Sequence, residues 1–168
     1  SACLQGDTAK RRVRGGSLRQ TGRVLMTIST THRPATDLGF LLHKHPERAQ
    51  EFPVAAGTAH VFYPVARDDE CTAALLVDID PIELVRGRHD PAFALGQYVN
   101  DRPYAASSLL AVALGKAFAS ARRGVSKERP ELAEAAIPLE VHLPALSCRG
   151  GTEMAVRFFA PLGWTVDA

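Results

Sequence analysis

The sequence predicts a mixed α/β domain, in which one mixed β-sheet packs against a buried central helix and flanking helices. Three observations predict this class. Residues 71–79 are continuously apolar from Ala73 to Val77, as in a strand that is covered on both faces. Residues 138–143 alternate apolar and polar side chains, which is typical of a half-buried strand. Between them, residues 103–121 carry apolar side chains nearly all the way round a helix, so we expect that helix to be buried on most sides.

The chain has 168 residues, a length that suits one domain. Its formal net charge of +2 is unevenly distributed, because residues 1–23 contain six Lys and Arg residues against Asp7 alone. That segment therefore carries +5 and the rest carries −3. We expect residues 1–25 to be a disordered basic extension and residues 26–168 to be the folded domain. The domain itself lacks the positive charge that is typical of nucleic-acid binding.

Two functions are open to the extension: a basic RNA-binding arm or a mitochondrial-type presequence. Against both, Met26 opens the first stretch that resembles protein core, so we expect the natural start there and no function in the residues before it. Three cysteines without CxxC spacing indicate a reducing cytoplasm. The apolar runs are too short to cross a bilayer.

The first elements of the domain are a strand and a short helix. Residues 25–30 contain β-branched side chains and predict the strand. After a turn, Thr36 or Asp37 is expected to cap the helix, and Pro46 is expected to end it.

A β-hairpin follows, with strands over 59–65 and 71–79 and a charged turn between them. We expect the second strand to be central in the sheet. Asp78 and Asp80 at its carboxyl end could bind a metal, because alternate residues share one face of a strand. The interpretation that we favour is that Asp80 caps a short helix over 81–85.

The central helix should begin at Pro103, because proline is tolerated in the first turn. Asn100, Asp101 and Arg102 are then displayed at its amino end. We predict that Asp101 caps the helix and that Arg102 and Asn100 contact a partner, as loops on rigid scaffolds often do. The alternative is purely local: Asn100 makes the turn and Arg102 pairs with a neighbouring carboxylate.

The remaining residues predict two helices and two strands. A short helix over 129–136 precedes the strand at 138–143, and a helix from Thr152 should face three side chains inward: Met154, Phe158 and Phe159. Gly163 should stop this helix, and a strand begins at Trp164. Because the chain leaves that strand almost at once, we expect a truncated polypeptide.

No GxSxG, GxxxxGK, GxGxxG after a strand, or HExxH motif occurs in the sequence. His43 and His45 suggest a metal site, but on a helix they point about 200° apart, so surface positions are the favoured interpretation. A catalytic thiol and base could be assembled only from residues far apart in the sequence: Cys71 or Cys148 with His60 or His142. This small stand-alone enzyme is the main alternative to a binding module.

Five stretches together resemble one family. They are 26–46 (MTISTTHRPATDLGFLLHKHP), 59–64 (AHVFYP), 74–81 (ALLVDIDP), 98–108 (YVNDRPYAASS) and 147–151 (SCRGG). The family is the amino-terminal region of bacterial 3′-terminal RNA ribose 2′-O-methyltransferases of the Hen type. The likeness covers essentially all of residues 26–168.

The resemblance implies a protein-binding module in RNA repair. In the family this region binds the bacterial polynucleotide kinase, phosphatase and ligase protein and activates its ligase. The resemblance implies that this region contacts RNA through that complex. The methyltransferase, with S-adenosylmethionine and a divalent metal (Mg or Mn), belongs to a later part of the parent protein. We therefore expect this chain to hold no cofactor and to neither bind S-adenosylmethionine nor methylate RNA.

Overall fold

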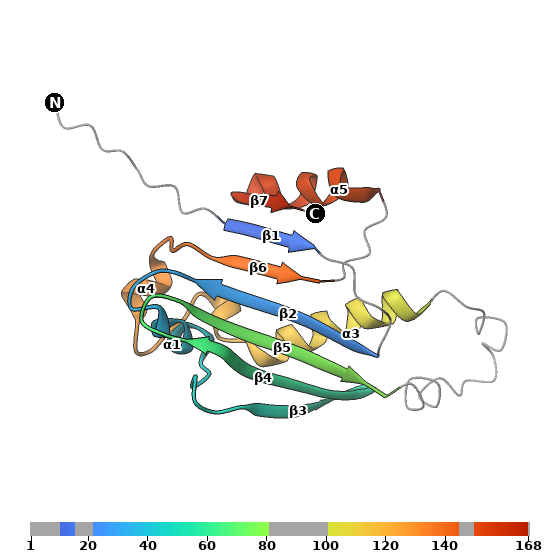
Figure 1. Ribbon diagram of the computed structural model, residues 1–168, viewed down its shortest axis with the longest axis horizontal. Coiled ribbons are helices and arrows are strands. Elements are labelled where there is room, and N and C mark those ends of the chain that lie inside the picture. The colour runs from blue at the N-terminus through green and yellow to red at the C-terminus, as the bar shows by residue number, and fades with distance from the viewer. Residues whose placement is uncertain (1–10, 16–21, 81–100, 145–149, 168) are drawn as a thin grey trace.

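The computed structural model describes residues 11–15, 22–80, 101–144 and 150–167, and in 11–15 and 101–106 it describes the course of the backbone. Within these ranges the chain forms one mixed sheet of seven strands with helices packed against it (Figure 1). The strands lie in the spatial order β3 (Gln50–Val54), β4 (Gly57–Ala66), β5 (Cys71–Ile79), β2 (Arg23–Thr30), β6 (Glu140–Leu143), β1 (Arg11–Gly15) and β7 (Trp164–Asp167).

The sheet has an antiparallel part and a parallel part. From β3 to β6 each strand is antiparallel to its neighbours, whereas β1 is parallel to both β6 and β7. The predicted hairpin is confirmed as β4 and β5, with Ala66 opposite Cys71 and a turn that is closed by the Arg67 N–H donating to Glu70 O at 2.9 Å. The predicted mixed α/β class is therefore also confirmed.

Strand β5 is the core of the antiparallel part, as the sequence predicts. Ala73, Leu75 and Val77 share one face and are at most 1% exposed, whereas on the opposite face Ala74 is buried but Thr72 and Leu76 are half-buried. Helices cover the fully buried face of this strand. Helix α3 (Asp101–Ala117) packs against β2, β3 and β5, and α1 (Leu38–Leu42) packs against β5.

Helix α3 is buried on one side, so the expectation that it is buried on most sides is wrong. Leu109, Ala113 and Ala117 recur every four residues and are buried, whereas Val112 is 57% exposed. The small residues on its buried face let the helix approach the sheet closely, while the opposite face is exposed at Val112. The helix begins at Asp101, two residues before Pro103, which still lies in the first turn.

The remaining helices are short. They are η1 (Ala35–Asp37), η3 (Ala121–Arg123), α4 (Pro130–Glu134), α5 (Gly151–Phe159) and η4 (Ala160–Leu162). Helix α5 packs against β7. Its buried residue is Ala155, and Met154 and Phe159 are half-buried, but Phe158 is 65% exposed. The prediction that Phe158 faces inward is therefore wrong.

Two further predictions differ from the structure. Residues 1–25 were expected to be irregular, but Arg11–Gly15 forms β1 and β2 begins at Arg23. Strand β3 was not predicted at all. The short helix expected over 81–85 lies outside the described residues. No helix in the described part of the chain has the length and apolarity needed to span a bilayer.

Candidate protein-docking groove

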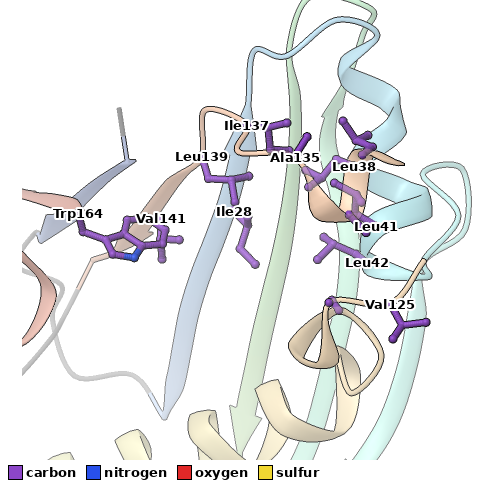
Figure 2. A pocket seen from close by; sticks show the side chains of 14 residues that line it. Ile28, Leu38, Leu41, Leu42, Val125, Ala135, Ile137, Leu139, Val141 and Trp164 are labelled. Carbon is purple, nitrogen blue, oxygen red and sulfur yellow. The ribbon is translucent and has the colours of Figure 1, made fainter. Parts of the chain in front are cut away.

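An open apolar groove runs across one face of the molecule, with a volume of about 380 Å³. Leu38, Leu41 and Leu42 of α1 line one end (Figure 2). The other end is formed by Val141 of β6 and Trp164 of β7, which lie side by side. Apolar side chains from six elements (β2, α1, η3, α4, β6 and β7) therefore meet around a space that the described chain leaves unfilled.

Gly124 and Val125 form one wall of the groove, and three polar contacts hold their loop, residues 124–129, against η1 and α1. His43 Nε2 lies 2.9 Å from Val125 O, and Ser126 Oγ donates to Phe40 O at 3.3 Å. Arg129 Nε donates to Asp37 Oδ2 at 3.0 Å. These contacts join residues more than 80 positions apart, so the groove depends on the tertiary fold.

The Arg129 guanidinium also covers the Phe40 ring, with its central carbon 4.6 Å from the ring centroid. A guanidinium over an aromatic face is stabilised by the quadrupole of the ring. The Asp37 carboxylate therefore accepts from Arg129 and accepts no capping hydrogen bond from a backbone N–H of the helix. Neither helix start has a side-chain cap. The prediction that Thr36 or Asp37 caps this helix is wrong.

Helix α1 also ends earlier than predicted. It ends at Leu42, and His43 adopts a left-handed conformation with φ 54°. The Lys44 N–H then donates to Gly39 O at 2.9 Å, which closes the helix end before Pro46 is reached. The reversal at His43 is what aims its imidazole at Val125.

Large apolar side chains are exposed beside the groove. Val125 in the wall is 53% exposed and Phe40 on α1 is 38% exposed. Exposed apolar groups that adjoin an open apolar groove are typical of protein-binding surfaces. The groove is therefore the best candidate for a docking site within the described residues.

A comparison with protein families identifies residues 24–168 as the "RNA repair, ligase-Pnkp-associating, region of Hen1". The chain belongs to this family. The family region begins within β2 and includes every groove-lining residue named above, but it excludes β1. A comparison with curated proteins found no match.

The predicted contact residues of this Hen1 region do not lie at the groove. Arg102 is the second residue of α3, while the groove adjoins Ala121, beyond the other end of that helix. A helix of 17 residues is about 25 Å long. Asn100 lies outside the described residues, and Asp101 is the first residue of the helix. Their predicted roles stay predictions.

The alternative of a cysteine enzyme finds no support at Cys71. This thiol is fully buried at the start of β5, and burial raises its pKa to about 11. His60 lies opposite Leu76, five residues along β5 from Cys71, which is roughly 17 Å. His142 lies opposite Thr27, two strands away from β5. Cys148 lies outside the described residues.

The other candidate ligands are separated or already engaged. Asp78 pairs with Arg23, with its Oδ2 3.3 Å from the guanidinium. His45 Nδ1 accepts from the Glu47 N–H at 3.3 Å, away from the His43 contact. Within the described ranges, no three His, Cys, Asp or Glu side chains lie close enough to hold a metal ion.

Sequence reasoning missed the groove. The alternating pattern over residues 138–143 does predict that Leu139 and Val141 share a face, and both line the groove. Nothing local, however, places Val125 or Trp164 beside them, because these residues come together only when β7 and the loop over 124–129 are in position.

Proposed function

We propose that this chain is a ligase-docking module, which binds the polynucleotide kinase, phosphatase and ligase protein Pnkp and activates its ligase. The observation that carries this proposal is the match of residues 24–168 to the ligase-Pnkp-associating region of Hen1. The apolar groove is the surface that we assign to the contact.

The groove suits this role physically. Binding energy in protein interfaces concentrates in a few apolar anchors that fill pockets in the partner surface. Here the anchors are on the ligase and the pocket is on this chain, with Leu41, Val125 and Trp164 available to enclose an inserted side chain. The contacts of Asp37 and Arg129 keep the wall in position before binding, which reduces the ordering cost of association.

We further propose that the parent protein is a bacterial, cytoplasmic enzyme that methylates the 2′-hydroxyl at RNA 3′ ends. S-adenosylmethionine would supply the methyl group and a divalent metal would assist its transfer. The described residues do not form a metal site, so we assign both groups to another part of the parent protein. RNA would meet this chain through the repair complex.

The test measures binding and activation with purified Pnkp ligase. Calorimetry gives the dissociation constant, and ligation of a nicked RNA gives the activation. We compare Val125→Glu with Val112→Glu, since both valines are more than half exposed and only Val125 lines the groove.

The proposal predicts that the unmodified chain binds the ligase and raises its rate. A charge buried at the contact should weaken binding by about 2 kcal/mol or more in Val125→Glu, whereas Val112→Glu should bind as the parent sequence does. A chain that binds no ligase would refute the proposed function. Equal binding by both variants would refute the assignment of the groove.

A further inference from the structure

Strands β6 and β7 are separated by the width of one strand. Both run parallel to β1, and the chain passes from β6 to β7 through α5, so this connection skips one position in the sheet. That position is filled by β1, which is labelled between the two strands in Figure 1. Residues 11–15 lie outside the family region of 24–168, whereas β6 and β7 lie within it. The family region therefore supplies both neighbours of this strand position but not the strand that fills it.

The backbone register gives the chemistry of the strand that fits. Val13 lies opposite Val141 on one side and Val166 on the other. On either side of this apolar centre the position has one acidic neighbour: Arg12 lies opposite Glu140 on β6 and Thr165 on β7, and Arg14 lies opposite Asp167 on β7 and His142 on β6. Opposite charges at paired positions of neighbouring strands are favourable. The position therefore selects an extended segment with an apolar residue between basic ones.

We propose that a basic extended segment of the ligase partner joins the sheet between β6 and β7, in place of β1. This inference rests on the proposed function and names a second contact within it. The occupant runs parallel to both neighbours and presents an apolar residue at the register position of Val13.

Exchange of one strand for another is feasible in this position. A strand that lies between two neighbours forms backbone hydrogen bonds on both sides, and an incoming segment restores the bonds that β1 gives up. Strand β1 has five residues, so the number of such bonds to be replaced is small. Segments that add to a sheet gain affinity from the backbone and specificity from alternate side chains, which here are the positions opposite Glu140 and Asp167.

The test is hydrogen exchange of the full chain, alone and with Pnkp ligase. The inference predicts that the amides of residues 11–15 are protected in the free chain and exchange at least about tenfold faster in the complex, because exchange follows local opening. The amides of β6 and β7 should stay protected, since the ligase segment takes over their hydrogen bonds. If the ligase binds while residues 11–15 remain protected, the inference is overturned and the proposed function stands. If no complex forms, the proposed function fails as well.

Two pairs of variants give an independent readout of affinity. Val13→Pro removes a backbone donor of β1 and should strengthen ligase binding about tenfold, because the position is then more often vacant. Val13→Thr keeps the donor and serves as its control. In the Val13→Pro background, where β1 no longer competes for the position, Glu140→Lys reverses the charge there and should weaken binding about tenfold. Glu134→Lys on α4 is its matched control and should bind normally. Equal affinities across all four variants would overturn the inference.

Discussion

The contact between Asp37 and Arg129 should stabilise the fold measurably, although the Arg129 side chain is partly exposed to solvent. The Asp37 side chain is 13% exposed and its Oδ2 accepts from Arg129 Nε at 3.0 Å, across 92 residues of sequence. A hydrogen bond to a charged group contributes about 1.5 to 3 kcal/mol. In Asp37→Ala the guanidinium, which is 44% exposed, regains water, so we expect a loss of about 1 to 2 kcal/mol.

An exposed ion pair in the same protein provides the matched control. Arg67 Nε lies 3.3 Å from Asp69 Oδ1, but these side chains are 61% and 54% exposed. Pairs of this kind contribute between 0 and about 1 kcal/mol, so Asp69→Ala should change the free energy of unfolding by less than about 0.5 kcal/mol. The two variants remove the same functional group from sites that differ in burial.

Urea unfolding measures both losses as shifts of the midpoint at constant slope. A double-mutant cycle with Arg129→Ala then isolates the pair, because Arg129 also covers Phe40 and its removal alone costs more than the pair is worth. We expect a coupling free energy of about 1 kcal/mol. If Asp37→Ala and Asp69→Ala were equally mild, or the coupling stayed below about 0.3 kcal/mol, burial would not be what strengthens this contact.

Four other predictions concern the core, the thiol and the amino end of α3, where there are two. Leu75→Ala removes a side chain that is 1% exposed and should cost about 3 to 5 kcal/mol, measured by urea unfolding. Burial raises the pKa of Cys71 from 9.0 to about 11 and also raises the pKa of Tyr63. The unfolded chain therefore loses these protons at a lower pH than the folded chain, so the free energy of unfolding should fall as the pH rises from about 9 towards 11. Cys71→Ala should flatten that decline. Asp101→Ala should cost about 0.5 to 2 kcal/mol of stability if Asp101 acts as a cap. Arg102→Ala should leave stability within about 0.5 kcal/mol and weaken ligase binding by about 2 kcal/mol, and an early-melting Arg102 variant with normal binding would contradict this role.

The parts of the fold that the sequence predicts are those whose signals are local. The hairpin of β4 and β5 combines two apolar runs with a short charged turn, and the structure confirms it. Helix α4 lies within the helix predicted over 129–136, and its first residue is Pro130, a residue type that the first turn tolerates. Strand β3 carries no comparable signal, because Pro53 interrupts its sequence pattern. The proline is tolerated because β3 is an edge strand that pairs with β4 alone, and the sequence does not show this position.

The degree of burial of each helix was not predictable, because it depends on which elements pack against that helix. The apolar residues of α3 encircle it, and periodicity cannot show that the sheet covers one side and leaves Val112 exposed. The same holds for Phe158, whose expected inward position depended on the packing of α5. The predicted role of Asp37 also failed for this reason, since Arg129 competes successfully for its carboxylate from 92 residues away.

The groove and the strand position between β6 and β7 adjoin each other, so their contributions to ligase binding should be coupled. Trp164 lines the groove and, in the register of β7 with β1, lies opposite Arg11. A ligase segment that replaces β1 would therefore lie next to whatever fills the groove. In a double-mutant cycle, Val13→Pro should strengthen binding less in the Val125→Glu background, with a coupling free energy of about 0.5 kcal/mol or more. Calorimetry of the four proteins measures this term, and effects that add to within about 0.3 kcal/mol would show that the ligase engages the two surfaces separately.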